Sequence, residues 1–328
     1  MRPTPGRARR LPVGGPVGGA VTALAVVLVV VVIVVVVAGR NGDDVPSGEL
    51  LVADAAFPSA LAPIAGGGLL YGERLTGRVI EIDATGRPAA APVAQLDVST
   101  SGQRGLLGLV VDDAGRTFAA WTEAELPAMR LVVGQVAPGP VRIVWDGPPS
   151  TELGNGGHLE LASDGSLVIG VGDLQDGALA DDPGSVNGKL LALDPDGPPD
   201  QVPVVLSSGW TNPFAFTVTP SGTLWVVDNS VGDARERLAL GDAAGGIPVS
   251  VLEFDQTLAP SGLAAVDDTH LALCGFVSRR LDLLRLDGEA GATTGAVLAD
   301  ACAVAVTRLS DGRLAYADET SIWTIEAG

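Results

Sequence analysis

Histidine, cysteine and lysine are scarce in this chain of 328 residues, which contains two histidines, two cysteines and a single lysine, Lys189. Two imidazoles are too few for a zinc site built from several histidines. The sequence also lacks a glycine-rich phosphate-binding loop and a nucleophile elbow, which mark nucleotide-binding proteins and α/β-hydrolases. The missing residues and motifs therefore exclude several common classes of enzyme.

Basic residues are also outnumbered, because 20 lysines and arginines face 39 aspartates and glutamates, which gives a net charge of −19. Five of the arginines lie at or before Arg40, whereas every acidic residue lies after it. The chain beyond residue 40 therefore carries 15 basic and 39 acidic residues, a net charge of −24. A field of this sign repels nucleic acids and anionic lipid surfaces, so we expect no nucleic-acid partner. The abundance of Ala, Gly, Val and Arg is typical of a bacterium with a GC-rich genome.

One long run without charge occupies residues 20–39, with the sequence AVTALAVVLVVVVIVVVVAG. A helix of this length spans roughly 30 Å, enough to cross the hydrocarbon core of a bilayer. Four arginines precede the run and acidic residues follow it, which predicts a cytoplasmic N-terminus and an extracytoplasmic remainder. The alternative is a cleavable signal peptide, although its apolar region is usually only about 7–15 residues long. We expect a basic cytoplasmic segment at 1–19, a single-pass transmembrane anchor in the cell membrane at 20–39, a linker at 40–50 and an extracytoplasmic domain at 51–328.

The extracytoplasmic part repeats one pattern six times: an apolar run, a polar turn and a second apolar run. The turns lie 44 to 57 residues apart and centre on Gly67, Gly115, Gly165, Gly222, Asp268 and Gly312. Glycine accepts the positive φ of a tight hairpin turn. Further apolar strands are expected at 77–83, 129–136, 188–194, 235–240, 279–287 and 321–326. A period near 50 with about four strands per repeat predicts an all-β fold, a six-bladed β-propeller; a pair of β-sandwiches, the alternative, would show no regular period.

Five blocks carry a more specific signal, in this order: FPSALAPIAGGGLLYGERLTGRVIEID, GQRGLLGLVVDD, NGGHLELASDGSLVIGVGD, DDPGSVNGKLLALDPDG and GWTNPFAFTVTPSGTLWVVDNS. Together they resemble consecutive blocks of the glucose/sorbosone dehydrogenases, also called aldose sugar dehydrogenases. The resemblance implies a six-bladed propeller that holds pyrroloquinoline quinone and Ca²⁺ in a central depression. It also implies a histidine that takes the proton of the sugar's C1 hydroxyl while hydride passes to the quinone, and arginines and a lysine that hold the cofactor's carboxylates.

The residues expected to do this chemistry are missing from the matching positions. The position of the catalytic base falls at Gly154, which has no side chain to accept a proton. An active-site arginine is replaced by Thr211, and two further cations of the last blade fall near Asp300 and Cys302. His158, four residues after Gly154, is the candidate for a relocated base; the alternative is a histidine packed within its blade. No catalytic residue is therefore assigned.

Candidate ligand-pocket residues remain at one face of the expected ring, because loops before first strands and ends of second strands open on the same side. They are Gln103, Asn155, Thr211, Asn212, Asp228 and Arg279. Calcium, the candidate metal, would bind Asp173 or Asp228, since Ca²⁺ prefers carboxylate and carbonyl oxygens. The acidic loop GDLQDGALADDPG, which begins at Gly172, could supply carboxylates too, although its spacing does not fit an EF-hand and a solvated turn is the alternative.

The only two cysteines, Cys274 and Cys302, lie late in the second strand of the fifth repeat and at the start of the first strand of the sixth. Both ends should reach the same face on adjacent blades, and an extracytoplasmic compartment permits oxidation. The sequence therefore predicts a disulfide between them, with two separate buried thiols as the alternative.

We predict a membrane-anchored extracytoplasmic propeller that resembles quinone-dependent sugar dehydrogenases but binds a small molecule or glycan without catalysis. Whether it is an enzyme stays open at this point. One alternative is a divergent pyrroloquinoline quinone-dependent aldose dehydrogenase, an oxidoreductase; the other is a Ca²⁺-dependent hydrolase or lactonase. A coloured bound cofactor would identify the first, and calcium-dependent cleavage of esters or lactones the second.

Overall fold

The computed structural model describes residues 48–124, 129–230 and 235–327, which belong to one compact unit. The expected transmembrane anchor at 20–39 and the segment at 1–19 lie outside the described residues. Within the described part of the chain, no helix has the length and apolar character needed to cross a membrane.

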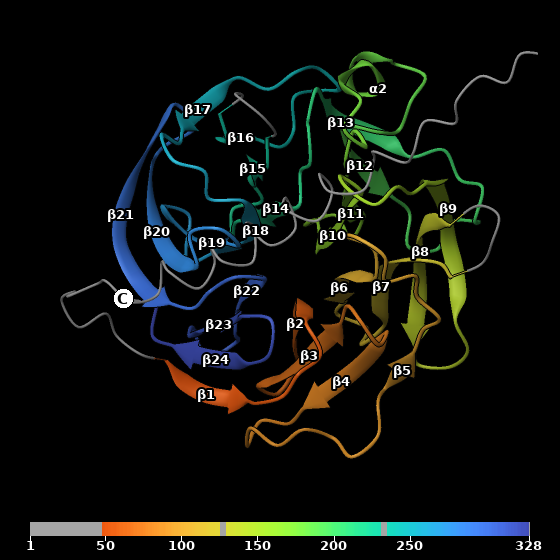
Figure 1. Ribbon diagram of the computed structural model, residues 1–328, viewed down its shortest axis with the longest axis vertical. Helices are drawn as coiled ribbons and strands as arrows, with labels where there is room; N and C mark the ends of the chain where they lie inside the picture. Colours follow the sequence, from red (N-terminus) through yellow and green to blue (C-terminus); the bar gives the residue numbers. More distant parts are fainter. Residues whose placement is uncertain (1–47, 125–128, 231–234, 328) are drawn as a thin grey trace, which may run out of the picture. The chain divides into compact units, whose positions relative to one another are not determined.

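Six four-stranded antiparallel sheets follow one another around a ring, in the order of the sequence (Figure 1). Blade one contains β2 (Pro58–Ile64), β3 (Gly68–Glu73), β4 (Arg78–Ile82) and β5 (Ala94–Gln95). Blade two contains β6 (Leu106–Val111), β7 (Thr117–Thr122), β8 (Arg130–Ala137) and β9 (Arg142–Pro149). Blade three contains β10 (Gly156–Leu161), β11 (Leu167–Val171), β12 (Lys189–Leu193) and β13 (Val204–Ser208).

The second half of the ring repeats this architecture. Blade four contains β14 (Ala215–Val218), β15 (Leu224–Asp228), β16 (Arg237–Leu240) and β17 (Ser250–Glu253). Blade five contains β18 (Pro260–Ala265), β19 (His270–Gly275), β20 (Arg280–Asp287) and β21 (Gly291–Asp300). Blade six contains β22 (Ala305–Arg308), β23 (Leu314–Ala317), β24 (Ile322–Ile325) and, from the other end of the described chain, β1 (Glu49–Val52). The predicted six-bladed propeller is confirmed.

All six predicted hairpin turns are confirmed, because each lies between the first and second strands of its blade. Blade three shows the chemistry of such a turn. Gly165 has φ +86°, and Asp164 Oδ1 accepts hydrogen bonds from the backbone N–H and the hydroxyl of Ser166 at 2.9 and 2.7 Å. Glycine supplies the left-handed conformation and the aspartate satisfies the turn's donors, which is why this dipeptide marks hairpins in sequence.

The ring is closed by β1, which pairs antiparallel with β24 and matches Glu49 to Thr324 and Val52 to Ile322. In Figure 1 the red-orange strand β1 lies beside the blue strands of blade six. Because β1 begins at Glu49, residues 49 and 50 of the expected linker belong to the propeller. The last sheet therefore contains strands from both ends of the described chain.

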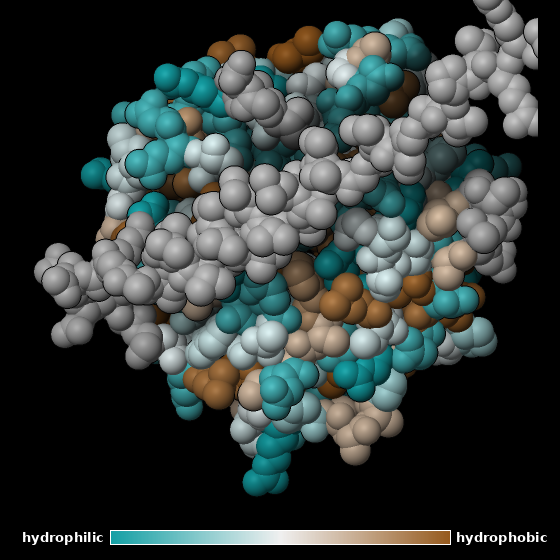
Figure 2. Space-filling model, in the orientation of Figure 1, coloured by the Kyte–Doolittle hydropathy of each residue, from teal (hydrophilic) through white to brown (hydrophobic). Residues whose placement is uncertain are grey.

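The hydrophobic core is divided among the interfaces between neighbouring blades. In the described residues it forms six clusters, one for each interface. The cluster between blades two and three contains large side chains such as Phe118 and Trp145. The cluster between blades five and six is rich in small residues, including Ala264, Ala272 and Ala299. On the face seen in Figure 2, hydrophilic residues cover much of the surface and hydrophobic ones form separate patches.

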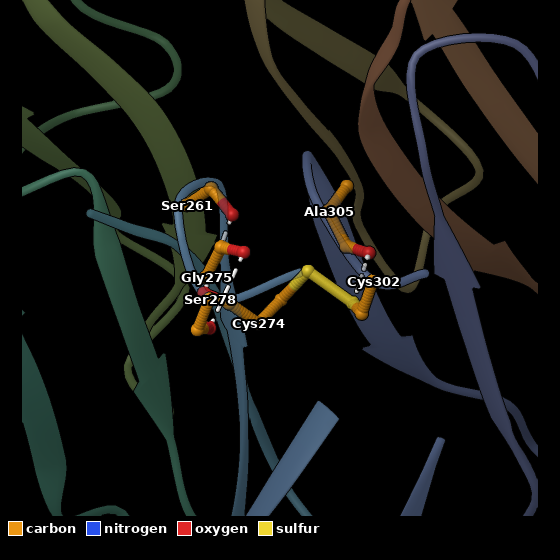
Figure 3. The surroundings of a disulfide bond; sticks show 6 residues. All are labelled: Ser261, Cys274, Gly275, Ser278, Cys302 and Ala305. Carbon is orange, nitrogen blue, oxygen red and sulfur yellow. Dashed lines mark hydrogen bonds between the residues drawn. A yellow bond between two sulfur atoms is a disulfide. The ribbon is translucent and has the colours of Figure 1, made fainter. Parts of the chain in front are cut away.

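The predicted disulfide is confirmed within this alanine-rich interface. Cys274 in β19 and Cys302 before β22 are joined, with their Cα atoms 5.4 Å apart (Figure 3). Both residues are completely buried. The bond therefore links blade five to blade six inside the packed core of their interface.

One short helix, α2 (Gly177–Asp181), lies between β11 and β12, and the chain's only lysine is buried against it. Lys189 Nζ donates hydrogen bonds to the carbonyl oxygens of Leu179, Ala180 and Asn187 at 3.3, 2.8 and 3.1 Å. Burial lowers the pKa of Lys189, while Asp182 and Asp181 oppose that shift. The ammonium group therefore caps the end of α2 from inside the protein.

Candidate functional site

A cavity of about 310 Å³ opens where the loops before the inner strands meet the loops after the second strands. Every blade contributes to its lining; the loops before the inner strands provide Phe57, Gln103, Asn155, Asn212, Ala259 and Ala303. The loops after second strands add Arg74, Asn229 and Phe276. This confirms that the two sets of loops open on one face, where a ligand would meet groups from the whole ring.

A larger hollow of about 1170 Å³ lies on the opposite face, between the hairpin turns. None of the predicted site residues lines it. Its acidic side chains include Asp112, whose carboxylate is already bonded to Arg116 Nε at 2.6 Å. We therefore assign the candidate site to the smaller cavity, and the term central cavity below refers to it.

Three of the predicted pocket residues, Gln103, Asn155 and Asn212, line the central cavity, but their amides are largely engaged already. Asn155 accepts the backbone N–H of Thr151 and donates to its carbonyl oxygen, both at 2.8 Å. Asn212 Oδ1 accepts the N–H of Gly156 at 3.0 Å. These two side chains fix the shape of the loops. Gln103 keeps its Nε2 group for a ligand.

Asp228 lies behind the cavity wall and acts on the loop that carries Thr211 and Asn212. The residue is 2 % exposed, and its carboxylate accepts the N–H of Thr211 at 3.0 Å and that of Asn212 at 2.9 Å. Burial raises the pKa of Asp228, although these hydrogen bonds and Arg237, 3.8 Å away, oppose the shift. Thr211 and Asp228 therefore support the site from behind; neither lines the cavity.

The metal candidates Asp173 and Asp228 both contact the backbone of Thr211, since the N–H of Asp173 donates to the Thr211 carbonyl at 2.8 Å. The Asp173 carboxylate accepts the N–H of Gln175 at 2.7 Å, and burial raises its pKa. In the acidic loop, Asp176 caps α2 by accepting the N–H of Ala178. Nowhere in the described ranges do three or more His, Cys, Asp or Glu side chains gather as a metal site.

At the position of the expected base, Gly154 has φ +68° and its N–H donates to Gln103 Oε1 at 2.9 Å. His158 does not line the cavity. Its ring packs between blades three and four, 4.7 Å from the ring of Phe216 and 5.9 Å from that of Phe214. The nearest ionisable partner of His158 is Glu160, 3.6 Å from Nε2. His158 thus lies in the packed interface. The position of the expected base, Gly154, carries no imidazole.

Arg279 also lies outside the cavity lining. Its guanidinium forms two hydrogen bonds with the carboxylate of Glu319, at 2.7 and 2.8 Å, and this pairing raises the pKa of Arg279. The predicted pocket arginine therefore joins blade five to the loop between β23 and β24.

The charged residue that does line the cavity, Arg74, is one that the sequence did not lead us to predict. It follows β3 directly, so it occupies the same place in its blade that Asn229 and Phe276 occupy in theirs. Its Nη1 group donates to the carbonyl oxygens of Gly102 and Arg104 at 2.8 and 3.1 Å. The rule already applied to second-strand ends in blades three and four would have found it in blade one.

The sequence matches a family model described as Glucose / Sorbosone dehydrogenase over residues 55–236. Its structure is similar to a putative oxidoreductase (glucose dehydrogenase) from Thermus thermophilus, at 24% identity and TM-score 0.73, over 85% of this chain and 99% of that one. The PQQ-bound aldose sugar dehydrogenase from Streptomyces coelicolor is 23% identical, with TM-score 0.70, over 87% of this chain and 99% of that one.

The apo form of the soluble aldose sugar dehydrogenase from Escherichia coli is 20% identical, with TM-score 0.72, over 85% of this chain and 98% of that one. A search of curated proteins found no match. At these identities the structural likeness shows the fold alone. The family-model match, in contrast, covers more than half of the chain.

Proposed function

This chain belongs to the glucose/sorbosone dehydrogenase family, and from that premise we propose that its propeller binds a small ligand in the central cavity without oxidising it. One observation carries the proposal. The described residues that line the cavity include no histidine, aspartate, glutamate, cysteine, tyrosine or lysine. Hydride transfer from C1 of an aldose requires a group that takes the proton of the C1 hydroxyl. Such a group must lie within hydrogen-bond reach of that hydroxyl.

The described donor set does not fit pyrroloquinoline quinone either. That cofactor carries three carboxylates, whereas the described cavity lining contains one cation, Arg74. Where the family resemblance places arginines, Thr211 has its N–H bonded to Asp228, and Cys302 is bound in the disulfide. A buried carboxylate without a paired cation costs several kcal/mol. The cavity is therefore matched to a ligand with less negative charge.

A Ca²⁺-dependent hydrolase gains no support from the site. Its metal would depend on Asp173 and Asp228, whose carboxylates accept backbone N–H groups and do not line the cavity. Ca²⁺ takes six to eight oxygen ligands. Ligand binding without metal chemistry accounts for the described contacts more directly.

The test of the proposed function is reconstitution of the purified propeller with pyrroloquinoline quinone and Ca²⁺. We expect no stoichiometric, coloured complex and no reduction of an electron-accepting dye with glucose or other aldoses. A dehydrogenase from the same family, treated identically, provides the positive control. Dye reduction that depends on both the aldose and the quinone would refute the proposal.

We also propose that the propeller lies outside the cytoplasmic membrane, where a small molecule or glycan would reach it. The arginines before residues 20–39 support this orientation, and so does the Cys274–Cys302 bond, because disulfides persist in oxidising compartments. Protease added to intact cells should digest the propeller. If it is digested only after the cells are lysed, the proposed location is wrong.

A further inference from the structure

Arg74 has no carboxylate partner among the described residues, in a protein that has nearly twice as many acidic as basic residues. Its Nη1 group is held by two neutral carbonyl oxygens, of Gly102 and Arg104. The adjacent acid, Glu73, is fully engaged by Arg78, Thr76 and the N–H of Ala56. The charge of Arg74 is therefore left uncompensated at the cavity wall, and burial lowers its pKa without making it neutral.

The Nη2 group of Arg74 is the part of its guanidinium left to bind a ligand. Nη1 donates to the two carbonyl oxygens, and Nε is buried without a hydrogen-bond partner among the described residues. Nη2 donates to no described residue and is not among the buried polar atoms. A hydrogen bond from this charged group to a carboxylate is roughly twice as strong as one between neutral groups.

The position of the guanidinium is fixed by its surroundings. The ring of Phe57, which also lines the cavity, lies over one face of the guanidinium with 4.1 Å between Arg74 Cζ and the ring centroid. The two carbonyl oxygens hold the Nη1 end. Only the Nη2 group is left to pair with a ligand. The ligand therefore meets a charge that is already oriented, and less binding energy is spent on ordering it.

Two serine hydroxyls in the cavity wall can accept hydrogen bonds from a ligand. Ser59 Oγ donates to the Leu106 carbonyl at 2.6 Å and Ser261 Oγ to that of Cys274 at 3.2 Å. Their single protons are thus occupied, and only their lone pairs face a ligand, which must then bring its own hydroxyl donors. Gln103 Nε2, which donates no hydrogen bond to any described residue, supplies a second donor.

We propose that the central cavity binds a hydroxylated monocarboxylate, whose carboxylate accepts a hydrogen bond from Nη2 of Arg74 and whose hydroxyls donate to Ser59 and Ser261. The inference rests on the proposed function, since it names the class of ligand for the same site. A single cation and several hydroxyl-directed groups match one carboxylate on a polyhydroxyl body of monosaccharide size, and a cavity of about 310 Å³ lies at the lower end of the usual range for small-molecule sites.

The test measures binding of two matched pairs of probes by isothermal titration calorimetry. Gluconate and glucitol differ only by a carboxylate in place of a CH₂OH group, and glucuronate and glucose differ in the same way. We expect the carboxylate of at least one pair to bind about ten- to a hundredfold more tightly than its neutral partner, the range for a hydrogen bond to a charged group.

Three variants decide whether Arg74 is responsible. Arg74→Gln should abolish the preference for the carboxylate. Gln103→Glu can still accept the Gly154 N–H, but it adds a negative charge to the cavity, so it should reduce carboxylate binding and spare the neutral probes. Arg285→Gln is the matched control, because Arg285 is exposed on β20, has no ion pair and lies outside the cavity lining. Circular dichroism and melting curves establish that each variant is folded.

The outcomes separate the inference from the proposed function. If neither carboxylate binds, or if glucitol and glucose bind as tightly, the monocarboxylate assignment is wrong whatever the dye assay shows. The same holds if folded Arg74→Gln keeps the preference, or if Arg285→Gln loses it to the same degree. Aldose-dependent dye reduction in the reconstituted protein, in contrast, refutes the proposed function and not the ligand class.

Discussion

Asp228 is a carboxylate buried behind the cavity wall, and its hydrogen bonds hold the loop that carries Thr211 and Asn212. Burial raises its pKa above the value of about 3.9 for an exposed aspartate. At a pH between the pKa of Asp228 in the unfolded chain and its pKa in the folded protein, the carboxyl group is ionised in the unfolded chain and protonated in the folded one. The contribution of Asp228 to stability is therefore fully present below about pH 3.9 and decreases as pH rises towards the folded pKa.

Asp228→Asn should consequently cost most at acidic pH. Both N–H groups donate to Oδ1, which the asparagine keeps, but its NH₂ group replaces Oδ2, which also accepts the N–H of Thr211 at 3.1 Å. We therefore expect a loss of about 0.5–1.5 kcal/mol in the free energy of unfolding near pH 4. The loss should shrink as pH rises, because ionised Asp228 is less favourable in its buried position. Urea unfolding from pH 4 to pH 8 measures this, with the exposed site Asp200→Asn as the control. A loss that grows with pH would contradict the assignment.

Gly154 is the second residue whose surroundings allow a definite prediction. Its φ of +68° is a left-handed conformation, and a Cβ placed on it would lie 3.4 Å from the backbone of Leu174 and Gln175. Gly154→Ala should lower the free energy of unfolding by about 1–2 kcal/mol. Gly177→Ala, at the start of α2 with no atom within 4 Å of the added methyl group, should be neutral or stabilising. Equal effects of the two changes would show that backbone conformation is not the cause.

Residues of this kind also mark the limit of prediction from sequence. Gln103, Asn155 and Asn212 were placed at the correct face because hairpin order fixes which loops open together. That the amides of Asn155 and Asn212 would be used by nearby backbone groups could not be predicted, since it depends on loop geometry. Arg279 was expected in the pocket and instead pairs with Glu319, forty residues later in the chain. Arg74 was overlooked although its position after a second strand was readable.

At the scale of strands and blades, the interface between blades five and six combines a covalent bond with side-chain packing. Its buried residues include three alanines of the strands β18, β19 and β21 beside larger side chains such as Leu314 and Tyr316. The turns and strand pairs were predictable because Asp-Gly and Ser-Gly between apolar runs form hairpin turns through their own local conformation. The unequal filling of the interfaces was not, because it depends on which blades face each other.

Replacing both cysteines tests the contribution of this bond. Cys274→Ala with Cys302→Ala should lower the free energy of unfolding by about 3.6 kcal/mol, the chain-entropy value for a separation of 28 residues. Hydrogen exchange should accelerate first in β19 and β22, which the bond joins. Reduction of the unmodified protein under denaturing conditions, followed by thiol blocking, should give the same loss on refolding. An unchanged urea midpoint would show that side-chain packing alone holds the two blades together.

At the scale of the whole ring, closure depends on four residues at the start of the described chain. β1 supplies the outer strand of blade six and buries Val52, which is 6% exposed. Without β1, the backbone groups of β24 that pair with it would form an exposed sheet edge, which promotes association between chains. The six-fold repeat predicted the number of blades, whereas the strand that completes the last one lacks a hairpin signal, and its first two residues were placed in the linker.

Two N-terminal deletions separate ring closure from the rest of the N-terminal segment. Removal of residues 1–46 leaves β1 intact and should not change the urea midpoint of the propeller. Removal of residues 1–52 deletes β1 and should cost about 2 kcal/mol or more, since burying one valine side chain is worth roughly that amount. Size-exclusion chromatography should also show self-association of the shorter protein only. Identical midpoints for the two proteins would mean that β1 contributes nothing to the stability of the ring.

The burial of Lys189 has a practical consequence for work with this protein. The residue is 2% exposed, its ammonium group donates to three carbonyl oxygens, and the chain has no other lysine. Amine-reactive dyes, biotin esters and aldehyde cross-linkers will find only the terminal α-amino group on the folded protein. Coupling to a sensor surface or to a resin therefore has to proceed through carboxylates, or through a lysine introduced at an exposed site such as Arg285.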